Sequence, residues 1–210
     1  MIYLISGSPR AGKSTLSREL GDKLKIPYLS VDNIRPIIMP YFKADEREKK
    51  FPFMKMFNAD KIDDFFRNYT DQEIFDADMT EITSVWPGVE SLIDHLLLCK
   101  MDYIIEGTHL LPHLVKKYKD NTNIKIMYLV KIHKEEILKG LYQNTSQYHD
   151  WLMGNTKNEE TIKFAAKSLI VYGKYFSEEA KKHGLMCINT EDNFEDRLTQ
   201  AKDILTSKNL

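Results

Sequence analysis

The sequence predicts an α/β fold built on a parallel β-sheet. Residues 2–16 join a short apolar run, a glycine-rich loop and a helical pattern with leucines at positions 16, 20 and 24. Further along, segments typical of strands alternate with segments typical of helices, an order that favours parallel strands with crossover helices. Because 210 residues suffice for one domain with a full hydrophobic core, we expect a single domain over residues 1–210.

The loop after the first predicted strand carries the clearest motif. Residues 7–14 read Gly-Ser-Pro-Arg-Ala-Gly-Lys-Ser and match G-x-x-x-x-G-K-[ST]. Backbone N–H groups of such a loop and the positive end of the following helix face an anion. We expect Lys13 to reach the β- and γ-phosphates of a nucleotide and the Ser14 hydroxyl to ligate Mg²⁺. The residues expected to bind the nucleotide are Gly7, Ser8, Pro9, Arg10, Ala11, Gly12, Lys13, Ser14 and Thr15.

Four further strands are predicted from short apolar runs, at residues 28–31, 103–105, 124–130 and 185–189. Residues 36–87 differ, because aromatic residues, methionines, charges and prolines occur there without strand alternation. We expect two or three helices that form a mobile excursion from the sheet. Its aromatic and methionine stripe at 51–66 favours a core or a dimer surface over a binding site.

Helix boundaries follow from caps and breakers. Thr70 and Glu73 form a capping box that opens a helix towards residue 86, and Pro87 with Gly88 is predicted to break it before a new helix at 89–98. Asp76 and Asp78 are expected to be solvated on the first of these helices. Other helices are expected at 110–118, from 135 to about 153, from a second capping box at Thr156 and Glu159 to 182, and from 193 to 205.

Polar residues at the ends of the second and third predicted strands suit phosphoryl transfer, because ligands of open parallel sheets bind beyond the carboxyl ends of the strands. Asp32 is the candidate carboxylate beside an acceptor hydroxyl. Arg35 is three residues on and suits an anionic group of the acceptor. The alternative is that Asp32 caps a helix and that Arg35 is its surface partner.

Glu106 ends an apolar strand, where a carboxylate is costly without a partner. We expect it to hold the Mg²⁺ shell through water or to contact the acceptor, with a structural role as the alternative. His109 suits a substrate phosphate and a helix cap equally well. Lysines within 131–163 either neutralise phosphates or lie on the surface.

Composition excludes several classes of protein. A formal net charge of −1 and 42% hydrophobic residues favour neither a disordered chain nor nucleic acid as an electrostatic partner. Cys99 and Cys187 lie in apolar contexts, which predicts buried free thiols in a reducing compartment. No window reaches the roughly 18 apolar residues of a membrane span, and no leader pattern opens the chain. We expect a cytoplasmic protein without a membrane partner, and leave a homodimer open.

Three strand-end segments together resemble the P-loop small-molecule kinases, of the nucleoside-kinase and shikimate-kinase type. They are residues 7–15, Asp32-x-x-Arg35, and residues 104–112, which read Ile-Ile-Glu-Gly-Thr-His-Leu-Leu-Pro. The last is particularly similar to the Glu-Gly-x-His-x-x-Pro stretch of 2-phosphoglycerate kinase-like proteins. The resemblance covers most of the chain. It implies a five-stranded parallel sheet in the order 2-3-1-4-5, an acceptor-binding helical excursion at 36–87 and a lid at about 131–163.

Carried over by position, the resemblance implies that Lys13 and Ser14 bind phosphate and Mg²⁺, and that Asp32, Arg35 and Glu106 face the acceptor. Relatives usually bring lid arginines onto the transferring phosphate, whereas no arginine occurs between residues 67 and 197 here. Lysine supplies charge without the planar fork of arginine. Either lysines or Arg10 replace the lid arginines, or turnover is weak.

The function that these patterns predict is an ATP-dependent, Mg²⁺-requiring kinase. It would move the γ-phosphoryl group to a small-molecule hydroxyl or phosphate acceptor, 2-phosphoglycerate-like or another metabolite. One alternative is a nucleoside or nucleoside monophosphate kinase. The other is a non-catalytic ATP-binding regulatory or toxin-like module, which the missing lid arginines favour.

Overall fold

A five-stranded parallel sheet with the strand order β2-β3-β1-β4-β5 forms the centre of the computed structural model, which describes residues 1–143, 150 and 152–207. The strands are β1 (Ile2–Gly7), β2 (Tyr28–Ser30), β3 (Tyr103–Glu106), β4 (Ile124–Val130) and β5 (Cys187–Asn189). β1 is buried along its whole length, which explains its unbroken apolar sequence. The predicted fold class and strand order are confirmed.

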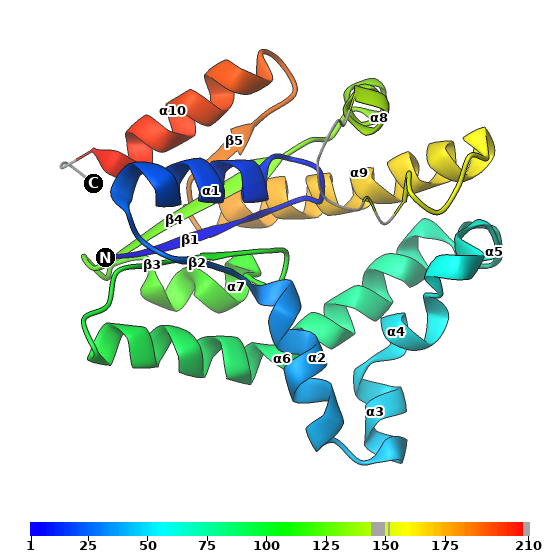
Figure 1. The fold of residues 1–210 in the computed structure, drawn as a ribbon, viewed down its shortest axis with the longest axis horizontal. Coiled ribbons are helices and arrows are strands. Elements are labelled where there is room, and N and C mark those ends of the chain that lie inside the picture. Colours follow the sequence, from blue (N-terminus) through cyan, green and yellow to red (C-terminus); the bar gives the residue numbers. More distant parts are fainter. Residues whose placement is uncertain (144–149, 151, 208–210) are drawn as a thin grey trace.

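Helices cover both faces of the sheet (Figure 1). On one face, α1 (Lys13–Leu24) and α10 (Phe194–Thr206) bury Leu16, Leu20 and Leu198 in one cluster with Ile5 of β1. On the other, α6 (Asp71–Leu98), α7 (Pro112–Val115) and α9 (Glu159–Lys182) share a core cluster with Leu4. Adjacent residues of β1 therefore serve opposite cores, as the alternation of a strand requires.

The predicted helix break at Pro87 is wrong, because α6 runs without interruption from 71 to 98. Both hydrogen bonds of its capping box at Thr70 and Glu73 form as predicted. A proline inside a helix costs about 3 kcal/mol, and the buried residues on either side of Pro87 offset that cost through packing. Gly88 allows close contact with the preceding excursion, since a Cβ there would lie 2.4 Å from Ile38.

The excursion consists of short helices: α2 (Ile34–Ile38), α3 (Ala44–Lys50), α4 (Pro52–Met56) and α5 (Ile62–Asn68), with 3₁₀ turns at Val31–Asn33, Met39–Tyr41 and Ala59–Lys61. Much of its aromatic stripe is core. The rings of Phe53, Phe57 and Phe65 lie 5.4–5.7 Å apart, centre to centre, and Phe65 and Phe66 are buried. The prediction of core packing holds for these residues.

The region predicted as a lid begins with α8 (Lys134–Gln143). Part of the helix predicted from 135 to 153 falls on residues 144–149 and 151, which lie outside the described residues. Residues 152–155 form a turn, so the helix does not extend to 153. The capping box at Thr156 is also wrong. Asn158 caps α9, while the Thr156 hydroxyl donates to Asp63 of α5 over 2.6 Å.

Both cysteines are free thiols, as predicted, but Cys99 is exposed because it follows the last residue of α6. Cys187 is partly buried, and burial raises the pKa of its thiol to about 11. None of the helices in the described part of the chain combines the length and the apolar character that a membrane span needs.

Candidate active site

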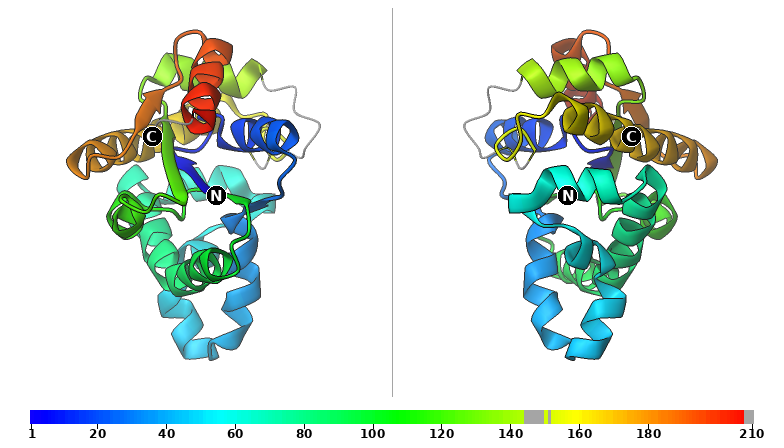
Figure 2. Two further views of the ribbon diagram at one scale, coloured as in Figure 1. Left: turned by 90° about the vertical axis from the view of Figure 1, so that its left-hand side faces the viewer. Right: turned by 90° about the vertical axis from the view of Figure 1, so that its right-hand side faces the viewer.

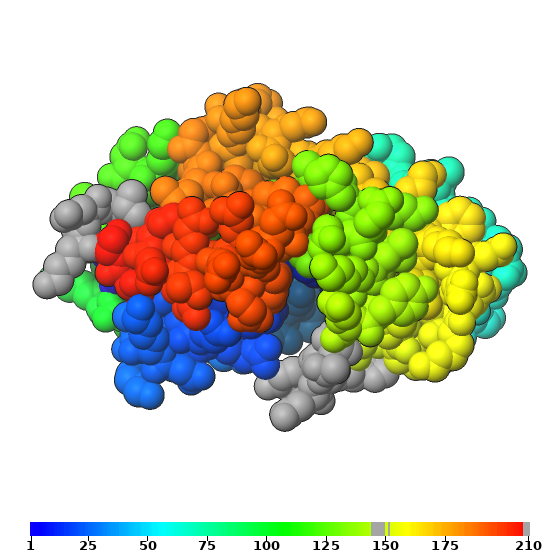
Figure 3. All heavy atoms as spheres, turned by 90° about the horizontal axis from the view of Figure 1, so that it is seen from above, coloured from blue at the N-terminus to red at the C-terminus, as the bar shows by residue number. Residues whose placement is uncertain are grey.

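The carboxyl ends of the strands all lie at one edge of the sheet, on the right in Figure 1. Figure 2, right, looks onto this edge, with α8 above it and the helical excursion below. Seen from above, α1 lies beside α10, and α8 lies beside the start of α9 (Figure 3). The expected nucleotide loop follows β1 at this edge, and Asp32 and Glu106 lie at the ends of β2 and β3.

Residues 7–14 form a loop that is tied to two neighbouring strands. The N–H of Ser8 donates to the carbonyl of Leu129 (3.0 Å), and the Ser8 hydroxyl accepts from the N–H of Lys131 (3.0 Å). The Thr190 hydroxyl, beyond β5, donates to the carbonyl of Ala11 (3.0 Å). These bonds fix the loop in space before any ligand binds.

Two glycines allow the path of this loop. Gly7 has a φ of 125°, and a Cβ there would lie 1.8 Å from the carbonyl oxygen of Leu129. Gly12 has a φ of 99° and precedes α1, where a Cβ would lie 2.8 Å from the ring of Phe194. No acidic side chain occupies the first turn of α1. Its N–H groups are therefore open to an anion.

Lys13 bonds back to its own loop. Its side chain is buried, and its Nζ donates to the carbonyl of Ser8 over 2.7 Å. Burial lowers the pKa of this ammonium, although the charges of Glu106 and Asp32 oppose the shift. The expected phosphate ligand thus lies in the loop, next to both candidate carboxylates.

Ser14 and Glu106 come together from α1 and β3. The Ser14 hydroxyl donates to Oε2 of Glu106 over 3.3 Å. Glu106 is buried, and burial raises the pKa of its carboxyl, while the charge of Lys13 acts against this. A hydroxyl and a carboxylate beside a phosphate loop suit Mg²⁺, which takes few protein ligands and keeps substrate oxygens and water. Among the described residues, no group of three or more His, Cys, Asp or Glu side chains is arranged to hold a metal ion by itself.

Asp32 lies in the 3₁₀ turn at 31–33 and caps no helix. Its Oδ1 is 3.1 Å from Nδ1 of His109, which is almost wholly buried. Partial burial works against ionisation of Asp32, but His109, Lys13 and Arg35 together hold the pKa of this carboxyl below its usual value. His109 thus contacts the candidate carboxylate instead of capping the next helix.

Arg35 does not pair with Asp32. Its guanidinium donates to Glu81 of α6 over 3.1 Å, and the other oxygen of Glu81 accepts the N–H of Met54 over 2.6 Å. Glu81 is completely buried, and burial raises the pKa of its carboxyl. The surface-partner alternative for Arg35 is therefore wrong, because Glu81 orients it from the interior.

Sequence reasoning missed three residues beside Arg35, namely Glu81, Asp78 and Tyr172. Asp78, expected to be solvated, accepts a hydrogen bond from the Tyr172 hydroxyl (3.0 Å). Burial raises the pKa of Asp78, and His109 and Arg35 act against this. Asp78 and Glu81 are three residues apart on the inward face of α6. The sequence signal that could have found them is a pair of acidic residues at helical spacing within an otherwise apolar helix face.

Curated proteins of similar sequence are kinases by name. No protein-family model matches the sequence. The chain is 27% identical over 191 residues to 2-phosphoglycerate kinase of Methanocaldococcus jannaschii, covering 88% of this chain and 57% of that protein. It is 22% identical over 221 residues to 2-phosphoglycerate kinase of Methanopyrus kandleri, covering 99% and 61%. The chain therefore spans little more than half the length of the curated relatives that it matches.

Solved structures show the same fold. Shikimate kinase from Acinetobacter baumannii matches with a TM-score of 0.50 and 17% identity, covering 100% of this chain and 94% of that one. Dephospho-CoA kinase from Campylobacter jejuni matches with a TM-score of 0.50 and 13% identity, covering 97% and 94%. The chain has the fold and the phosphate loop of a P-loop small-molecule kinase. The resemblance inferred from its motifs is confirmed.

Arg10 of the P-loop contacts the region predicted as the lid. Its guanidinium donates from Nη1 to Oδ2 of Asp150 (2.6 Å) and from Nη2 to Oδ1, and both side chains are largely buried. Arg10 is therefore paired in this structure. Three lysines after 133 are exposed, namely Lys139, Lys157 and Lys163, and Lys134 is half-buried.

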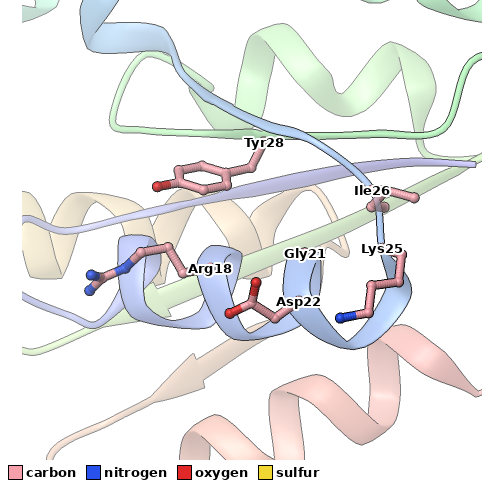
Figure 4. A pocket seen from close by; sticks show the side chains of 6 residues that line it. All are labelled: Arg18, Gly21, Asp22, Lys25, Ile26 and Tyr28. Carbon is pink, nitrogen blue, oxygen red and sulfur yellow. The ribbon is translucent and has the colours of Figure 1, made fainter.

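A surface pocket lies away from the phosphate loop (Figure 4). It is found between the later turns of α1 and the start of β2, and is lined by Arg18, Gly21, Asp22, Lys25, Ile26 and Tyr28. Because β2 begins there, the pocket belongs to the opposite end of the strand from Asp32. We assign it no part in phosphoryl transfer.

Proposed function

We propose that this protein is an ATP-dependent kinase that phosphorylates a small molecule. The observation that carries the proposal is the meeting of Lys13, Ser14, Glu106 and Asp32 at one point of the sheet edge. Phosphoryl transfer depends mainly on positioning and charge neutralisation, and these residue types supply both. The named kinases among the relatives support the same activity.

Different residues would bind the triphosphate, the Mg²⁺ ion and the acceptor. The loop N–H groups and Lys13 would bind the triphosphate, and Ser14 with Glu106 would hold Mg²⁺, which supplies charge neutralisation when it is bound. The acceptor oxygen forms a bond to the γ-phosphorus as the bond from that phosphorus to the bridging oxygen of ADP breaks. Asp32 would orient the attacking hydroxyl and take its proton.

The acceptor is proposed from chemistry and from the names of the relatives. Arg35 is partly exposed next to Asp32 and suits an anionic group on the acceptor. The curated relatives act on 2-phosphoglycerate according to their names, which makes this compound the first acceptor to test. We propose a cytoplasmic protein without a nucleic-acid partner, supported by two free thiols and a net charge of −1.

The comparisons do not favour the alternatives of a nucleoside kinase or a non-catalytic module. A coupled assay of ADP release with 2-phosphoglycerate and a panel of other hydroxylated metabolites tests the proposal. Wild-type protein should release ADP only with an acceptor, and Lys13→Ala should abolish release without unfolding the chain. Lys23→Ala is the matched control, because this lysine is exposed in the last turn of the same helix. Equal turnover by Lys13→Ala would reject the assignment.

A further inference from the structure

Lys131 differs from every other lysine predicted to belong to the lid. It directly follows β4, and its backbone N–H donates to the hydroxyl of Ser8 in the P-loop. Its side chain is only 7% exposed, whereas the lysines at 134, 139, 157 and 163 are exposed or half-buried. The chain therefore places one lysine inside the molecule, directly beside the phosphate loop.

The ammonium of Lys131 has no anionic partner among the described residues. It makes neither an ion pair nor a hydrogen bond there, and lies 5.1 Å from the ring centre of Phe194. Burial lowers its pKa, and the charges of Glu136 and Glu191 only act against this from a distance. Glu191 is engaged elsewhere, since its Oε1 accepts the N–H groups of Ile132 and His133 and its Oε2 contacts His133 and Asn189. An ammonium on a largely buried side chain is costly without an anionic partner, which favours an anion supplied from outside the protein.

The surroundings of Lys131 point towards the nucleotide. The ring of Phe194 that lies under its Nζ also packs against Gly12, the residue that opens α1. On the other side is α8, where a Cβ at Gly140 would lie 3.3 Å from Nζ. Figure 3 shows α8 next to the first turns of α10. The ammonium thus lies between the phosphate loop and the first helix of the predicted lid.

We propose that Lys131 binds a phosphate oxygen of the nucleotide and takes the place of the arginines that the lid lacks. The inference rests on the proposed function, because it requires nucleotide at the loop. A phosphate would give the buried ammonium the anion that the protein does not provide. The cost of the unpaired charge in the free protein is then offset only in the complex, which ties the stability of the chain to nucleotide binding.

This proposal predicts opposite effects on stability and on binding. Methionine has nearly the length of lysine without its charge, so Lys131→Met should raise the melting temperature of the free protein by about 2–4 °C. The same variant should bind Mg·ADP and Mg·tripolyphosphate on the order of tenfold more weakly by calorimetry. Lys131→Arg should restore part of the affinity. Lys163→Met, which removes an exposed lysine of α9, should change neither quantity.

The outcomes separate this inference from the proposed function. If wild-type protein binds Mg·ADP and Lys131→Met binds it equally well, the role of Lys131 is rejected while the kinase assignment stands. A variant that is less stable than wild type would make Lys131 a structural residue and would also reject the inference. A loss of affinity for Mg·ADP but not for Mg·tripolyphosphate would place the contact on the nucleoside and overturn the phosphate role. Absence of any nucleotide binding by folded wild-type protein would overturn the proposed function itself.

Discussion

Arg10 of the P-loop and Asp150, 140 residues further along the chain, form a two-point ion pair that joins the loop to the turn before α9. The Asp150 carboxylate also accepts the N–H groups of Leu152 and Met153 at 3.0 Å, so it organises that turn. The charge of Arg10 is thereby already matched within the protein. This leaves the unpaired ammonium of Lys131 as the better substitute for a lid arginine.

Replacing Asp150 by Asn should destabilise the protein. The pair is largely buried, and a hydrogen bond to a charged group contributes about 1.5–3 kcal/mol to stability. We therefore expect the free energy of unfolding, measured in urea, to fall by about 2 kcal/mol. Glu159→Gln is the control, because its pair with Lys163 is exposed and should contribute less than about 0.5 kcal/mol. Equal effects of the two substitutions would contradict the structural role of the Arg10 pair.

The same pair predicts a pH dependence with a defined sign. Burial opposes ionisation of Asp150, yet Arg10 and the turn N–H groups hold the pKa of its carboxyl well below the usual value. A lowered pKa in the folded state stabilises the protein above the unfolded-state pKa of about 4. The stability difference between wild type and Asp150→Asn should therefore be full at neutral pH and shrink as the pH falls below about 4. A difference that grows on acidification would be inconsistent with this sign.

Glu106→Gln should raise the Mg²⁺ requirement of the reaction. Removing one charge beside Ser14 should increase the Mg²⁺ concentration for half-maximal activity by about 10–100-fold. Because burial raises the pKa of Glu106, wild-type kcat/KM should fall with acidification at a pH above the ordinary carboxyl range. A Mg²⁺ titration at fixed ATP checks the first effect. Unchanged Mg²⁺ dependence in Glu106→Gln would remove this residue from the metal site.

His109→Gln should act through Asp32. Asp32→Asn should lower kcat by about 10²–10⁴-fold, as expected for loss of a general base, whereas His109→Gln should lower it by about tenfold. Because His109 helps to lower the pKa of Asp32, its loss should also move the acidic limb of the kcat profile to higher pH. This shift is the diagnostic readout. A drop in kcat with an unchanged pH profile would show that His109 contributes packing alone.

Glycine at position 173 should be required where α9 crosses β4. A Cβ there would lie 1.9 Å from the carbonyl oxygen of Lys131, so Gly173→Ala should lower the melting temperature markedly. Gly140→Ala is the matched control in α8, since its Cβ would meet only the flexible end of Lys131. Thermal unfolding should separate the two. Equal melting temperatures would contradict the close approach of α9 to β4.

Local sequence patterns were sufficient for the sheet and the phosphate loop. The buried strand β1 and the motif at 7–14 are contiguous, and their physical requirements act within a few residues. Asp32 and Glu106 were found because parallel strands bring their carboxyl ends to one edge. Their roles in catalysis stay predictions, although the structure places both beside Lys13.

The errors arose where distant residues decide the outcome. Pro87 would break an isolated helix, but packing of its neighbours keeps α6 continuous. Thr156 does not form the predicted capping box, because its hydroxyl donates to the carboxylate of Asp63 on another helix. Asp78 was expected to be solvated and Glu81 was missed, because their partners, Tyr172 and Arg35, are far away in the sequence.

Calorimetric titration of the folded protein with a non-hydrolysable ATP analogue in the presence of Mg²⁺ tests the central claim most directly. The structure predicts one bound nucleotide per chain and loss of that binding in Lys13→Ala. A titration that shows no uptake by folded wild-type protein, or an equal affinity in Lys13→Ala, would contradict a nucleotide site at this loop.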